Sequence, residues 1–161
     1  MVAFLLPPFR KIFAICLLAL VMSGAASARS PIAAVNTEHG LAVKGYDPVS
    51  YFTDRKPVRG SAQFSTSYKG VEYRFVSAEH RDRFLAEPEK FAPQYGGYCA
   101  FAIALNTIAD IDPDEWAIVN DKLYLNNSFF SQKLWSLDKS GNIVHGDQNW
   151  PLVPKLSEPN G

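Results

Sequence analysis

The feature that most constrains the fold is a strand that runs directly into a capped helix. Tyr73 and Phe75 alternate with a charged residue, which is the period-two pattern of a half-buried strand. Ser77 then offers a hydroxyl that can cap a helix. His80 and Phe84 are four residues apart and share one face of that helix. We therefore expect a strand, a cap and an amphipathic helix with one histidine on its inner face.

Two β-hairpins are expected in the chain. Residues 63–68 and 71–76 have the composition of one pair of strands, joined by a Lys-Gly turn. Residues 116–119 and 123–125 have the composition of a second pair, joined by an Asn-Asp turn. Short helices account for most other segments. The sequence thus predicts an α+β fold, a single small domain of two antiparallel hairpins with short helices packed on one face.

Two helix boundaries are predicted in the second half. Asp112 is followed by proline, which is a helix-start signal, so the acidic stretch Asp110–Glu115 is expected to be a solvated turn and helix start. This stretch lacks the glycine and distal glutamate of a calcium loop. A later helix, capped by Ser128, is expected to end at Gly141.

The two hairpin regions echo each other at an offset of 51 residues. Tyr73, Ser77 and Phe84 fall on three equivalent residues, Tyr124, Ser128 and Trp135. His80 falls on a serine instead, so one copy carries the imidazole. Two interpretations stay open: a duplicated unit in which one copy keeps a site, or the general likeness of any capped hairpin–helix segment.

Residues 1–28 have the pattern of a secretory signal peptide. A basic pair at 10–11 precedes an apolar run over residues 12–22, and Ala-Ser-Ala at 26–28 is a small-residue cleavage site. A membrane anchor is the alternative, but the run is short for a span. We expect export to the periplasm or the extracellular space, with no stable membrane insertion after cleavage.

The charge balance argues against a nucleic-acid partner. The chain has 16 basic and 16 acidic residues, and no basic stripe. The segment after residue 28 is long enough for one core. It contains a single cysteine, Cys99, so it cannot form an internal disulfide. A lone cysteine in an oxidising compartment is buried and inert, reactive, or a ligand.

His80 and Cys99 are the candidate metal ligands. His80 lies in the first turn of its helix, where the partial positive charge disfavours a protonated ring, so we expect a neutral imidazole that can bind a metal. A structural histidine is the alternative. Cys99 lies among apolar neighbours, which favours an inert thiol unless a metal or histidine is near. Copper or zinc would suit this pair. Tyr73, Tyr98 and Asp47 are candidate pocket residues.

The other two histidines, His39 and His145, lie in polar, glycine-adjacent stretches. They are expected to be exposed loop residues.

The central segment resembles the YHS domain family in residue type and spacing. The matching residues are Tyr73, Phe75, Ser77, His80, Phe84, Pro88 and Phe91. Gly45–Val49 resembles the opening of that domain, and Tyr95–Ala100 resembles the ending seen in a secreted bacterial branch. The resemblance implies a metal-handling role inferred for relatives that carry cysteines. Here Ser50 and Val76 stand where such cysteines are expected.

These observations give one layout and three functional hypotheses. We expect a signal peptide at 1–28, a loose lead-in at 29–42, a YHS-like domain at 43–105 and an extension at 106–161 packed on the same core. The leading hypothesis is an exported binding module that takes a transition-metal ion through His80 and Cys99, rather than an enzyme. The alternatives are a structural or protein-interaction domain without a ligand, and a thiol-dependent enzyme that uses Cys99.

Overall fold

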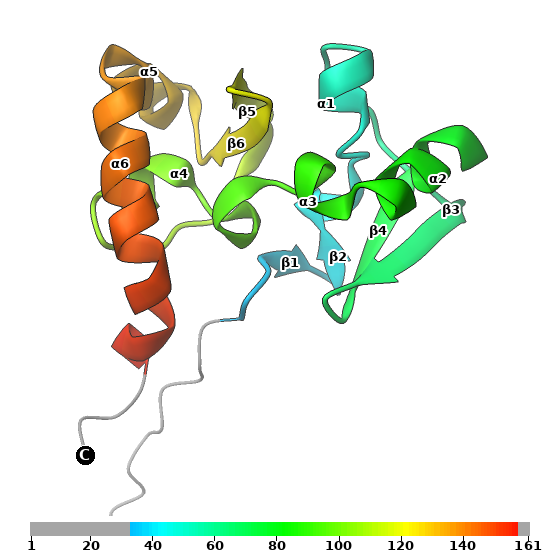
Figure 1. Cartoon of the computed structure of the whole chain (residues 1–161), viewed down its shortest axis with the longest axis horizontal. Helices are drawn as coiled ribbons and strands as arrows, with labels where there is room; N and C mark the ends of the chain where they lie inside the picture. Colours follow the sequence, from blue (N-terminus) through cyan, green and yellow to red (C-terminus); the bar gives the residue numbers. More distant parts are fainter. Residues whose placement is uncertain (1–32, 158–161) are drawn as a thin grey trace, which may run out of the picture.

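The computed structural model describes residues 33–157 and has two lobes (Figure 1). Residues 37–91 form one lobe, and residues 100–157 form most of the other. The expected signal peptide at 1–28 lies outside the described residues. Between residues 33 and 157, no helix has the length and apolar character needed to cross a membrane.

The first lobe contains a four-stranded sheet. Its strands are β1 (Thr37–Glu38), β2 (Leu41–Ala42), β3 (Ser61–Tyr68) and β4 (Val71–Phe75), in the spatial order β1-β2-β4-β3. β3 and β4 are the predicted antiparallel hairpin, whereas β2 runs parallel to β4. The sheet thus extends into the segment at 29–42 that the sequence predicts to be loose.

The helices of this lobe follow the predicted strand–cap–helix order. They are η1 (Val43–Gly45), α1 (Ser50–Thr53), α2 (Ala78–Ala86) and α3 (Pro88–Phe91). The Ser77 hydroxyl accepts a hydrogen bond from the His80 backbone N–H at 3.2 Å, which confirms the predicted cap. Phe84 is fully buried, and its ring lies 4.8 Å from that of Tyr73 and 5.2 Å from that of Phe75. This aromatic contact fixes α2 on the sheet.

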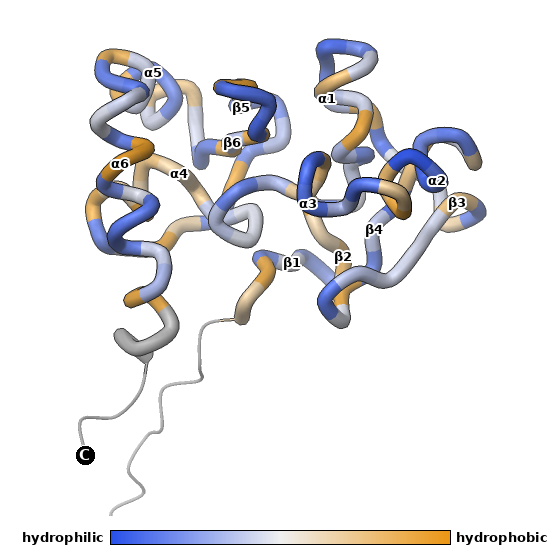
Figure 2. Tube along the Cα trace, viewed as in Figure 1, coloured by the Kyte–Doolittle hydropathy of each residue, from blue (hydrophilic) through white to orange (hydrophobic). Residues whose placement is uncertain are grey.

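The second lobe contains the second predicted hairpin and most of the remaining helices. Its elements are η2 (Gln94–Gly97), α4 (Ala100–Ala104), β5 (Asp112–Val119), β6 (Lys122–Asn126), α5 (Phe129–Leu137), α6 (Lys139–Asn149) and η3 (Trp150–Ser157). β5 and β6 pair antiparallel, as predicted. Figure 2 shows α4 in hydrophobic colours and α2 mostly in hydrophilic ones. This agrees with their burial, since α4 is almost entirely buried and Phe84 is the buried residue of α2. The α+β class is confirmed.

Two predicted boundaries in this lobe are wrong. Asp112 begins β5 rather than a helix, because it pairs with Asn126 and the carbonyl of Pro113 accepts the Tyr51 hydroxyl at 3.0 Å. Gly141 does not end a helix either. It lies in the first turn of α6, where the Asp138 side chain accepts a hydrogen bond from its N–H at 2.9 Å. The Asp138 carboxylate therefore caps the start of a new helix that contains this glycine.

The two hairpins are structural repeats at the offset of 51 residues. Both contain the same interruption of register: Ser61–Phe75 and Ser65–Arg74 flank it in the first hairpin, and Asp112–Asn126 and Trp116–Leu125 flank it in the second. The helices that follow, α2 and α5, are both nine residues long. Ser128 caps α5 by accepting from the Ser131 N–H at 3.3 Å, as Ser77 caps α2. The structure supports a duplicated unit over a chance likeness.

One core joins the two repeats. The larger buried cluster includes Tyr51 and Phe84 from the first lobe together with Leu123 and Leu125 from the second. Tyr51 also packs edge-on against Trp116, with ring centroids 5.3 Å apart. A second cluster around Trp135 and Tyr124 lies under α5 and α6. The lobes thus share a continuous apolar contact.

Candidate functional site

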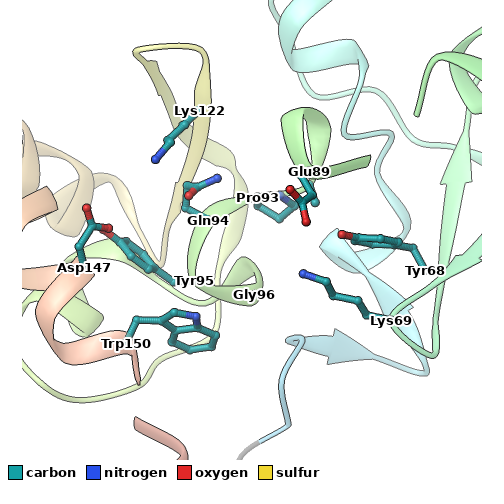
Figure 3. A pocket seen from close by; sticks show the side chains of 11 residues that line it. Tyr68, Lys69, Glu89, Pro93, Gln94, Tyr95, Gly96, Lys122, Asp147 and Trp150 are labelled. Carbon is teal, nitrogen blue, oxygen red and sulfur yellow. The ribbon is translucent and has the colours of Figure 1, made fainter. Parts of the chain in front are cut away.

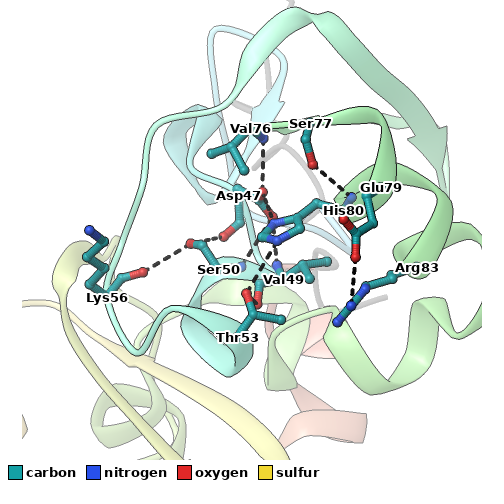
Figure 4. Close-up of polar contacts among 10 residues, drawn as sticks. All are labelled: Asp47, Val49, Ser50, Thr53, Lys56, Val76, Ser77, Glu79, His80 and Arg83. Atoms are coloured by element: carbon teal, nitrogen blue, oxygen red, sulfur yellow. Dashed lines mark hydrogen bonds and ion pairs between the residues drawn. The ribbon is translucent and has the colours of Figure 1, made fainter.

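A fully buried carboxylate, Asp47, lies where α1, β4 and α2 meet (Figure 4). Its Oδ1 accepts hydrogen bonds from the backbone N–H groups of Val49 at 2.8 Å and Ser50 at 3.3 Å. Its Oδ2 accepts from the backbone N–H of Val76 at 3.0 Å. Asp47 precedes Pro48, a pair typical of a helix start, and its side chain accordingly binds the first N–H groups of α1 and also reaches the residue after β4. A buried charge of this kind is tolerated because it is fully hydrogen-bonded.

The fourth partner of Asp47 is the His80 ring. Nδ1 of His80 lies 2.7 Å from Oδ2 of Asp47. An ionised carboxylate only accepts hydrogen bonds, so Nδ1 carries the proton. Nε2 then holds the lone pair whenever the ring is neutral, and it lies 3.4 Å from the hydroxyl oxygen of Thr53. The ring is largely buried, with 12 % of its side chain exposed, while Thr53 is exposed. The structure thus fixes the ring through Nδ1, and Nε2 faces the hydroxyl of an exposed threonine.

Cys99 has a different environment from His80. Its side chain is 1 % exposed, and its thiol donates to the side-chain oxygen of Asn126 at 3.6 Å. The same oxygen accepts the backbone N–H of Phe101 at 3.0 Å. The polar contacts of His80 go instead to Asp47, Thr53 and Ser77. The two predicted ligands therefore have separate partners. Within the described residues, no group of three or more His, Cys, Asp or Glu side chains is arranged to hold a metal.

The segment that carries His80 matches a known domain family. The family model of the YHS domain matches residues 49–95, which include α1, the first hairpin, α2 and α3. The chain contains a YHS domain. His80 lies inside the matched segment, whereas Asp47 lies two residues before it and Cys99 four residues after it. No curated protein and no solved structure matches the chain.

The second repeat has different residues at the positions equivalent to Asp47 and His80. Gly45-Tyr46-Asp47 and Gly97-Tyr98-Cys99 are equivalent at an offset of 52 residues. The backbone contacts are similar, because the N–H of Asp47 donates to Val58 O and that of Cys99 donates to Ala109 O, with one residue fewer in the second loop. Cys99 thus occupies the position of Asp47 in the second repeat. Ser131 occupies that of His80, so the carboxylate–imidazole pair of the first repeat has no counterpart in the second.

Two further sequence candidates lie apart from the Asp47–His80 pair. Tyr73 is 2 % exposed and belongs to the core of the YHS domain, where burial raises its pKa to about 12. Tyr98 is half-buried, and its hydroxyl donates to Ala33 O at 3.1 Å. Burial, with a smaller contribution from Asp110, raises the pKa of Tyr98. Of the three pocket candidates, the structure brings Asp47 to the histidine.

The remaining histidines are both exposed. His39 lies in the turn between β1 and β2, as expected of a loop residue. His145 lies within α6 rather than in a loop, because the Asp138 cap carries the helix through this stretch.

The sequence reasoning missed two parts of these sites. One is Thr53, the last residue of α1, whose hydroxyl contacts His80 Nε2 and which no local sequence pattern marks. Asn126 is fully buried in β6 and supplies the oxygen that Cys99 and Phe101 share. The available signal for Asn126 was a polar residue at the end of an apolar strand.

Proposed function

We propose that this protein is an exported, non-enzymatic binding module of the YHS type that presents His80 Nε2 to a transition-metal ion. The observation that carries the proposal is the 2.7 Å contact between His80 Nδ1 and the buried Asp47 carboxylate. Histidines that ligate metals usually donate the other ring N–H to a carboxylate, a backbone carbonyl or a water, which fixes the ring and makes the ligating nitrogen more basic. Imidazole suits copper and zinc.

The donor set fits one protein–metal bond rather than a closed site. A structural zinc site needs four ligands, and the described residues offer no group of three. Further ligands would come from water or from the molecule that delivers or receives the ion. Such an open arrangement suits transient holding of a metal. Cys99 can bind the same ion only if its thiol breaks its hydrogen bond to Asn126. The Cys99→Ser variant below tests whether it does.

Calorimetric titration of the untagged protein with Cu²⁺ and Zn²⁺ tests this proposal. His80→Asn is the informative variant, because an amide can still donate to Asp47 while the Nε2 position is lost. We expect at least about tenfold weaker binding, ~1.4 kcal/mol. His145→Asn, a change at an exposed histidine in α6, is the matched control and should bind as the parent does.

The outcomes of this titration separate the hypotheses. Equal binding by the His80→Asn variant and the parent, or no binding by the parent, would refute the proposal. Cys99→Ser distinguishes the two donor sets: unchanged affinity assigns the ion to His80, and weaker affinity assigns it to His80 and Cys99 together.

A structural or protein-interaction domain is the second candidate, and one observation favours it. Asp47 accepts backbone N–H groups at the start of α1 and just after β4 and contacts α2 through the His80 ring, which stabilises a fold whether or not a ligand binds. Under this hypothesis His80→Asn would leave metal affinity untouched, and any effect would appear as a lower free energy of unfolding.

Export is part of the proposal and rests on the pattern at residues 1–28. Cell fractionation tests it: the intact chain should appear outside the cytoplasm in a shortened form. A chain that starts at Arg29 should stay inside. Recovery of the intact chain, uncleaved, in the cytoplasm would contradict export.

A further inference from the structure

A pocket of about 410 Å³ lies between the two repeats, away from the Asp47–His80 pair (Figure 3). Tyr68 and Lys69 reach it from the first hairpin, and Lys122 reaches it from the second. Glu89 of α3 and Asp147 of α6 also line it. Its volume is in the lower part of the range for small-molecule sites, and the junction of two units is a common place for such a site.

Both lysines of this pocket are available to a ligand. They come from corresponding places, since Lys69 is in the turn of the first hairpin and Lys122 begins β6 after the turn of the second. Neither forms an ion pair with a carboxylate between residues 33 and 157. The Lys69 ammonium lies 5.1 Å from the centre of the Tyr68 ring. The two lobes thus each contribute one ammonium group that can bind an anion.

The same pocket has two carboxylates. Oδ1 of Asp147 accepts the Tyr95 hydroxyl at 3.0 Å, which leaves its other oxygen for a ligand. Burial, and next the charge of Asp147, raise the pKa of Tyr95, so this hydroxyl stays a donor. Glu89 is exposed and makes no ion pair with the residues that the structure describes. Figure 3 shows Glu89 on the side of Lys69, and Asp147 on the side of Lys122.

Aromatic rings form the apolar part of the wall. Tyr95 is buried, and its ring centroid lies 6.2 Å from that of Trp150. Ile143 O, at 3.2 Å, is a second acceptor for the single Tyr95 O–H, so both acceptors that hold this ring belong to α6. Gly146 makes room for it, since a Cβ at that position would lie 2.5 Å from the hydroxyl oxygen. This side of the pocket is therefore preformed.

We propose that this pocket binds a zwitterion of about the size of one amino acid. The ligand carboxylate pairs with Lys122 and its ammonium group pairs with the free oxygen of Asp147, which lie on the same side of the pocket, and its apolar part packs on Trp150. The reason is charge balance: two ammonium and two carboxylate groups line one small pocket, so a ligand with a single sign of charge meets like charges at close range. This site is independent of the metal proposed at His80.

A set of three phenylalanine compounds tests the charge requirement. The probes are L-phenylalanine, N-acetyl-L-phenylalanine and L-phenylalaninamide, which are a zwitterion, an anion and a cation with one common ring. Binding is measured by calorimetry and by tryptophan fluorescence, because Trp150 lines the pocket. We expect L-phenylalanine to bind at least tenfold more tightly than both single-charge analogues. Equal or tighter binding of either analogue would overturn the proposal, and so would the absence of binding by all three.

Variants place the binding in this pocket. Lys69→Met combined with Lys122→Met should weaken L-phenylalanine binding at least tenfold. Lys133→Met, at an exposed position in α5, is the control and should change nothing. Trp150→Phe should remove the fluorescence response while calorimetric binding persists. Unchanged affinity in the double variant would show that the ligand binds elsewhere and would overturn the assignment.

Discussion

At the scale of single residues, Asp47 joins α1, β4 and α2 in the first repeat. Its carboxylate accepts four hydrogen bonds without contact with solvent, three from backbone groups and one from His80. Both oxygens are in use. Few substitutions at position 47 preserve these four hydrogen bonds. All four partners are N–H donors, so a side chain that also presents a donor would face one of them.

Replacing Asp47 with asparagine should lower the free energy of unfolding by about 3 kcal/mol. One amide oxygen can still accept from Val49, but the NH₂ group would face the donors of Val76 and His80. Urea unfolding measures the loss. Asp54→Asn, at an exposed neighbour, should stay within about 0.5 kcal/mol of the parent. Equal stability of the two variants would show that the buried carboxylate is dispensable.

Cys99 should be unreactive in the folded protein. Its thiol is buried and donates to Asn126, and a thiol reacts only as an accessible thiolate. In a chain that starts at Arg29 this is the sole cysteine. Labelling with a thiol reagent at neutral pH should be slow in buffer and fast in urea. Fast labelling of the native protein would revive the hypothesis of a thiol-dependent enzyme.

At the scale of elements, the two serine caps make equivalent hydrogen bonds at the start of equivalent helices. Ser77 and Ser128 both accept the backbone N–H of the third residue along, and each precedes a nine-residue helix. The repeat therefore offers an internal comparison of one interaction in two lobes.

Ser77→Ala and Ser128→Ala should each destabilise the protein by about 1 kcal/mol, because a helix N–H loses its partner. The double variant should lose about the sum, since the caps lie in different lobes. Thermal and urea unfolding measure these changes. Ser136→Ala within α5 should show no comparable loss. A cap variant as stable as the parent would mean that water replaces the hydroxyl at no cost.

At the scale of the whole molecule, the two repeats should unfold together. Their core residues form one cluster, and Tyr51 of the first lobe bonds to Pro113 O of the second. An extended apolar contact of this kind couples the stability of both lobes.

Leu123→Ala tests this coupling from the second lobe. The side chain is fully buried, so the change should cost about 3 kcal/mol. Tryptophan fluorescence reports the second lobe, which holds all three tryptophans, and the His80 ring signal in NMR reports the first. Both probes should show one shared, lowered urea midpoint. A His80 signal that keeps the parent midpoint would show that the lobes unfold separately.

The sequence by itself determined the local units of this protein. The alternation at Tyr73 and Phe75, the Ser77 cap and the spacing of His80 and Phe84 gave a strand, a cap and a helix, and the structure confirms each. The second hairpin and the Ser128 cap were found in the same way. These features depend on residues a few positions apart, so their energetics are largely contained in the local sequence.

Only the tertiary structure decided which distant groups meet. It places Asp47 on His80 across 33 positions of sequence, gives Cys99 to Asn126, and brings Lys69 and Lys122 to one pocket. It also turns the Asp112 helix signal into a strand. The physical reason is that a weak local preference gives way when strand pairing and burial of a shared core are gained elsewhere, and such gains depend on the packing of both repeats.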